Sequence, residues 1–109
     1  MTSGKTVVYL RTSTRADKKW MVTITRGDDL AKTVHFGADG YEDYTIHKDP
    51  ERKRRYEARH KGNEKWTKSG IKTAGFWSKW LLWNKPSMRA SINDTSERFA
   101  IKIIKKEPP

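Results

Sequence analysis

The chain has 109 residues, no cysteine, and a formal net charge of +11, with 34% hydrophobic and 34% charged residues. This length predicts a single domain with one modest core, and the lack of cysteine excludes a disulfide framework or a thiolate metal site. No apolar run reaches membrane-spanning length and no signal-peptide core is visible, so we expect a soluble protein made inside a cell.

The positive charge is concentrated in the second half of the chain. Residues 1–49 carry eight Lys or Arg and seven Asp or Glu, whereas residues 50–109 carry sixteen and six. An asymmetry of this size indicates that the second half contacts an anionic partner while the first half has another role.

Three segments near the N-terminus have the composition of β-strands. Residues 6–11 (TVVYLR) and 32–36 (KTVHF) are rich in β-branched and aromatic side chains, and residues 20–25 (WMVTIT) alternate between two faces. Their connections are too short for crossover helices, which predicts a three-stranded antiparallel meander. Such a sheet needs a covering layer. We expect residues 1–5 and 107–109 to be loose tails.

A joint and then a strongly basic helix follow the strands. In residues 37–48, Tyr41 and Tyr44 are expected to pack beneath the helix that comes next. Asp49 is a good helix cap, Pro50 suits the first helical position, and the segment 50–61 (PERKRRYEARHK) predicts a helix. Its two acidic residues cannot balance its six Lys and Arg, so most of its surface must face water or a polyanion.

Two further helices are predicted after a polar loop at residues 62–72. Residues 74–84 (AGFWSKWLLWN) are the most apolar part of the chain and should form the central core helix. Residues 86–98 predict a third helix, with an apolar stripe that includes Ile92 and Phe99. Residues 100–106 either add an edge strand or stay loose. The predicted fold is therefore α+β, with an N-terminal sheet packed against three C-terminal helices.

The run KTVHFGADGYEDYTIHKDPERKRRYEARH, followed by TAGFWSKWLLWNKPS, resembles a small family of basic proteins from nucleocytoplasmic large DNA viruses. Members occur in giant viruses of amoebae, such as mimivirus and megavirus, and in algal viruses. The resemblance covers residues 32–99, the family-like core. It implies an abundant virion protein that packages viral DNA as chromatin, located with the genome in the virion interior and in the viral factory of the host cytoplasm.

The residues themselves also favour contact with double-stranded DNA. Each Lys or Arg placed at a phosphate releases condensed counterions, so a dense cationic face binds duplex with little regard to sequence. Arg52, Arg55 and Arg59 share one face of the predicted helix at three- and four-residue spacing. The candidate DNA-binding residues are Arg52, Lys53, Arg54, Arg55, Arg59, Lys61, Lys65, Lys68, Lys72, Lys79 and Lys85.

Each of these features also has an ordinary structural explanation. A basic helix can be a solvated face with local pairs such as Glu57–Lys61. The tryptophans could stack on unpaired bases, but helical spacing places Trp77, Trp80 and Trp83 in the core. Trp66, in a Lys-rich loop, is the better candidate for an exposed ring.

The histidines raise the question of catalysis. His35, His47 and His60 could surround a metal together with nearby aspartates, but their spacing matches no known signature. His35 is better explained as a hydrogen-bonded strand residue and His60 as a cation at a helix C-terminus. We therefore expect no enzyme activity, no cofactor, no metal and no small-molecule substrate.

Three classes of function remain. The leading hypothesis is a non-enzymatic, non-sequence-specific DNA-binding protein that neutralises and compacts viral DNA. The alternatives are an internal structural protein associated with the capsid, and a small metal-dependent nuclease. Compaction needs bridging between duplexes or contact between protein molecules, and self-association through a sheet edge or through residues 101–106 would supply the second.

Overall fold

The computed structural model describes residues 6–27 and 29–106, and the predicted loose tails at residues 1–5 and 107–109 lie outside this range. The protein is α+β, with three N-terminal strands followed by helices, as predicted. The strands are β1 (Thr6–Thr12), β2 (Lys18–Arg26) and β3 (Asp29–Ala38), and they pair as an antiparallel meander.

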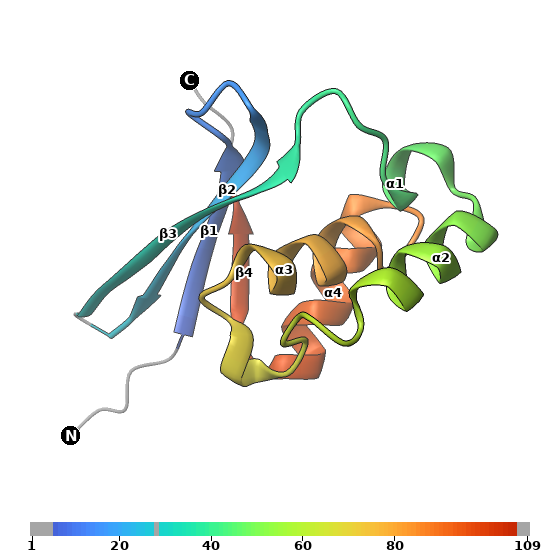
Figure 1. Cartoon of the computed structure of the whole chain (residues 1–109). Helices are drawn as coiled ribbons and strands as arrows, with labels where there is room; N and C mark the ends of the chain where they lie inside the picture. The colour runs from blue at the N-terminus through green and yellow to red at the C-terminus, as the bar shows by residue number, and fades with distance from the viewer. Residues whose placement is uncertain (1–5, 28, 107–109) are drawn as a thin grey trace.

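A fourth strand, β4 (Lys102–Lys105), makes the sheet mixed. It pairs in parallel with β1, which gives the order β3-β2-β1-β4 (Figure 1). The alternation of residues 100–106 is compatible with either an edge strand or a loose tail, and the structure shows an edge strand. A parallel neighbour requires the chain to cross over the sheet between the paired strands. The described helices all lie between β3 and β4 in the chain, and β4 then returns to pair with β1.

One face of the sheet carries the core. The buried strand residues include Val8, Leu10, Val22 and Phe36, which the register places on the same face. The alternation of residues 20–25 is confirmed, since Trp20, Val22 and Ile24 share one face and all belong to or pack against this core. The helical residues that meet it are Phe76, Trp77, Leu81 and Leu82, together with Ile101 before β4.

The joint between sheet and basic helix differs from the prediction. A short helix, α1 (Tyr44–His47), forms there because the Asp43 carboxylate accepts from the Thr45 N–H and caps it. Tyr44 is half-buried and lies under the Lys53 ammonium. Tyr41, expected to pack beneath the basic helix, is 73% exposed, so that prediction is wrong.

The basic helix forms as α2 (Pro50–His60). The Asp49 side chain accepts from the Glu51 N–H at 3.0 Å, and Pro50 takes the first turn, where its missing N–H costs nothing. Tyr56 is its buried residue. Figure 1 shows α2 on the far side of the central helices from the sheet.

The predicted core helix at residues 74–84 is divided into two forms of helix. It begins as α3 (Ala74–Trp77), capped by Thr73, and widens into the π-helical turn η2 (Ser78–Leu82), where the Trp83 N–H donates to the Ser78 carbonyl at 3.1 Å. Leu81 and Leu82 are adjacent in sequence and both buried, and the wider turn accommodates both side chains. Trp83 lies beyond the helix.

The last helix, α4 (Met88–Phe99), starts two residues later than predicted. Ser87 is the cap, with its side chain accepting from the Ala90 N–H, so Pro86 precedes the cap and does not begin the helix. The predicted inward stripe is confirmed, since Thr95 is fully buried and Ile92 and Phe99 pack against the core. The segment predicted as a loop contains a short 3-10 turn, η1 (Lys68–Gly70).

Candidate nucleic-acid interface

An aromatic stack attaches the basic helix to the rest of the protein. The rings of Tyr56 and Trp83 lie parallel, with 3° between their planes and 4.4 Å between their centroids. His60 packs against the same tyrosine at 4.3 Å, and Trp66 lies 6.4 Å away in a parallel orientation. Burial raises the pKa of the Tyr56 hydroxyl above its usual range. Tyr56 is the one buried residue of α2, and most of the other residues of the helix are exposed.

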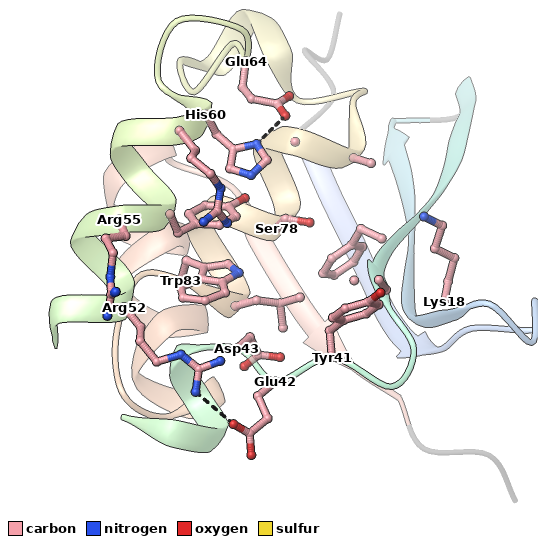
Figure 2. A pocket seen from close by; sticks show the side chains of 18 residues that line it. Lys18, Tyr41, Glu42, Asp43, Arg52, Arg55, His60, Glu64, Ser78 and Trp83 are labelled. Atoms are coloured by element: carbon pink, nitrogen blue, oxygen red, sulfur yellow. Dashed lines mark hydrogen bonds and ion pairs between the residues drawn. The ribbon is translucent and has the colours of Figure 1, made fainter. Parts of the chain in front are cut away.

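A cleft of about 620 Å³ opens between α2 and one end of the sheet, and residues of α3 and η2 also line it. Arg52, Arg55 and Arg59 line it from the helix, as their shared face predicts, and Lys18 and Tyr41 line it from the other side. In Figure 2, Trp83 and Ser78 lie between these two walls, with Glu64 and His60 at one end. No local sequence pattern indicates this cleft, because its second wall comes from residues more than ten positions away from the arginines of α2.

The acidic groups of the cleft are already bound to neighbours. Glu42 forms an ion pair with Arg52 at 3.0 Å, and Glu64 lies 3.3 Å from His60. The buried Asp43 carboxylate accepts from the Lys19 ammonium at 2.6 Å. Arg55 and Arg59 therefore keep their charge uncompensated, with no ion pair to any acidic residue in the described ranges.

Two of the predicted DNA-binding residues face the protein interior. Lys79 is buried and forms an ion pair with Glu57, and its ammonium also lies over the rings of Trp66 and Trp80. Lys53 is half-buried, and desolvation lowers its pKa. Lys79 cannot reach a phosphate without leaving this pair, so we do not count it among the cations that are free to bind DNA.

The remaining predicted cations are exposed. Arg54 forms a local ion pair with Glu51, one turn away on α2. Five predicted cations beyond the helix are also exposed: Lys61, Lys65, Lys68, Lys72 and Lys85. None of the five forms an ion pair with an acidic residue in the part of the chain that the structure describes. We call Arg55, Arg59, Lys61 and Lys65 the basic segment, because they are exposed, unpaired and close in sequence.

The aromatic and histidine predictions have mixed outcomes. Trp66 is half-buried rather than an exposed ring, and its indole N–H is buried without a hydrogen-bond partner among the described residues. His35 is hydrogen-bonded to the Ser13 hydroxyl at 2.8 Å, as a structural role predicts. His47 accepts from the Asp49 N–H and packs against Trp83.

Two observations concern other classes of site. Nowhere in the described ranges do three His, Cys, Asp or Glu side chains gather closely enough to hold a metal ion. Within the same ranges, no helix has the length and apolar character needed to cross a membrane.

Comparison with known proteins gives one similarity. A search of the curated proteins and a search of the solved structures each found no match to the chain. Residues 8–60 match a family model described as "Family of unknown function (DUF5754)". The matched range contains nearly all of β1, and β2, β3, α1 and α2 in full. Over the sheet and the basic helix, this chain is therefore similar to a protein family of unknown function.

Proposed function

We propose that this protein binds double-stranded DNA without sequence preference and compacts it, through the basic segment and the exposed arginines of α2. The observation that carries the proposal is the open attachment of α2. Tyr56 is the one buried residue of the helix, and Arg54, Arg55 and Arg59 are exposed on its surface. A dense array of cations on an exposed surface favours contact with phosphates.

The charge distribution supports backbone contact over base readout. The volume of the cleft, about 620 Å³, is far too small for a whole duplex to enter, so a duplex would be contacted at the surface. Arg55 and Arg59 at its edge offer the forked geometry that binds phosphate oxygens through two parallel hydrogen bonds. Contacts of this kind fix the position of a protein on DNA but carry no sequence information.

The resemblance to basic proteins of large DNA viruses supports the setting. In that setting the protein would coat the viral genome in the virion interior, and it would first meet DNA in the viral factory of the host cytoplasm. The role is non-enzymatic and needs no cofactor, because charge neutralisation requires only cations and a surface that presents them.

Competition binding tests this proposal. A labelled duplex is bound to the full chain and displaced with unlabelled duplexes of equal length and unrelated sequence. We expect equal displacement by all of them, and weaker displacement by a neutral polymer. Selective displacement by one sequence would indicate a regulator, and absence of binding at low salt would refute the proposal.

A further inference from the structure

The sheet has a second face that no described helix covers. Strand register places Val7, Tyr9 and Arg11 of β1 opposite in direction to the buried Val8 and Leu10. The parallel pairing aligns Lys102 with Val7 and Ile104 with Tyr9, so these β4 residues point the same way. Figure 1 shows the helices gathered on the other side of the sheet.

This outward face is cationic and free of acidic residues over three adjacent strands. The sequences of β1, β2 and β4 contain no Asp or Glu. Arg11, Lys102 and Lys106 are exposed, and the Lys106 ammonium lies 5.5 Å from the centre of the Tyr9 ring. That contact holds a positive charge over the central strand of the sheet. We call Arg11, Lys102 and Lys106 the sheet cations.

Hydroxyl groups lie on the same face. Thr23 of β2 pairs with Thr33 of β3, and their side-chain oxygens are 3.4 Å apart at an exposed position. Hydroxyls, a tyrosine and cations on one exposed surface can form hydrogen bonds and ion pairs with phosphate oxygens. A polyanion would meet complementary charge on this face.

The two cationic surfaces face away from one another. The outward face of the sheet lies on the opposite side from the core, and the helices α3, η2 and α4 stand between the sheet and α2 (Figure 1). One duplex cannot readily contact both surfaces, because straight B-DNA does not bend around a small protein without a cost of several kcal/mol. Binding one duplex at each surface requires no bending of DNA and therefore avoids this cost.

We infer that the outward face of the sheet is a second DNA-binding site, and that one molecule bridges two duplexes. This inference rests on the proposed function, since it assumes that the α2 side binds the first duplex. It assigns compaction to the monomer itself, with β4 and β1 presenting the second set of cations, and it makes contact between protein molecules unnecessary.

Bridging is measured with two short duplexes, one carrying a donor fluorophore and the other an acceptor. The variants are R11Q/K102Q/K106Q for the sheet and, as a control with the same change in net charge, K32Q/R89Q/R98Q elsewhere on the surface. We expect energy transfer for the wild type and the control, and its loss in the sheet variant. Affinity of the sheet variant for a single duplex at low concentration should stay within about threefold of the wild type, because the α2 side is intact.

The outcomes separate the two proposals. If the wild type binds no duplex, the proposed function fails. If the wild type binds and bridges and the sheet variant bridges equally well, the second site is refuted while the first stands. Sedimentation of the protein alone completes the test, because bridging by a preformed dimer, with the sheet variant monomeric, would also overturn the inference.

Discussion

Tyr56 and Trp83 lie face to face, 4.4 Å apart and 3° from parallel, and this contact joins the basic helix to the core. Tyr56, the one buried residue of α2, thereby packs against Trp83, which follows the π-helical turn of the central helix. The cations around Tyr56 are thereby held in a fixed orientation. In α2, Tyr56 packs against the core, and the adjacent Arg55 is proposed to bind DNA.

Tyr56→Ala should detach α2 from the aromatic stack. Truncation of a buried aromatic ring removes apolar contact area and leaves a cavity, at a cost of about 3 kcal/mol in the free energy of unfolding. Tyr56→Phe is the matched control, since the hydroxyl makes no hydrogen bond within the described residues and the ring contacts remain. Chemical denaturation of both variants measures the difference. Equal stability of the two variants would mean that the stack does not hold the helix.

The same tyrosine predicts a dependence of stability on alkaline pH. Burial raises the pKa of Tyr56 in the folded protein, whereas in the unfolded chain a tyrosine ionises near a pKa of about 10. The contribution of Tyr56 to the free energy of unfolding is full below that pKa and is lost as the pH rises toward the folded pKa. In that range the tyrosine ionises in the unfolded chain but not in the folded protein. Thermal unfolding between about pH 8 and pH 11 should show the wild type losing stability relative to Tyr56→Phe, and parallel profiles would contradict this.

Lys79→Ala separates structural from DNA-binding cations. The ammonium is buried beside Glu57, and its loss leaves a partly exposed carboxylate without its partner. We expect a loss of about 1–2 kcal/mol in stability. The affinity of the folded variant for duplex DNA should change less than that of Lys65→Ala, whose side chain is exposed. Denaturation and a binding titration on both variants test this, and a larger affinity loss for Lys79→Ala would restore Lys79 to the binding surface.

Two glycines near the basic segment should respond differently to alanine. A Cβ at Gly70 would lie 2.1 Å from the Lys65 carbonyl oxygen, so the backbone of residues 65–70 would have to move. A Cβ at Gly75 would meet the end of the flexible Glu64 side chain, which can rotate away. Gly70→Ala should therefore lower stability by about 1–3 kcal/mol, and Gly75→Ala should cost less. The reverse order in thermal unfolding would show that this loop is not packed as described.

Local chemistry predicted some elements well. Asp49 and Pro50 mark the start of α2, and the alternation in β2 identifies its buried face, since both signals act within a few residues. Whether residues 100–106 form a strand depends on pairing with β1, 95 positions earlier, which no local pattern encodes. The same is true of Tyr41, whose ring was expected to be buried and is exposed.

The candidate site shows the same division. Arg52, Arg55 and Arg59 lie on one helix face because helical periodicity places them there, and the structure brings all three to the cleft. In sequence, Lys79 cannot be distinguished from the exposed lysines, but tertiary packing brings it into an ion pair with Glu57 on α2. Trp66 was expected to be exposed and is instead held between Tyr56 and Lys79, because the loop folds back over the stack.

The most direct test of DNA binding by the α2 side is the salt dependence of affinity for one short duplex. The wild type should show a log–log slope of about −4 to −7, as five to eight phosphate contacts require. The variant R55Q/R59Q should bind more weakly, with a slope smaller in magnitude by about 2, since each lost phosphate contact removes about 0.9. The control R89Q/R98Q, with the same loss of charge on α4, should keep the wild-type slope. Equal slopes for all three proteins would contradict phosphate contact by Arg55 and Arg59 and would remove α2 from the DNA-binding site.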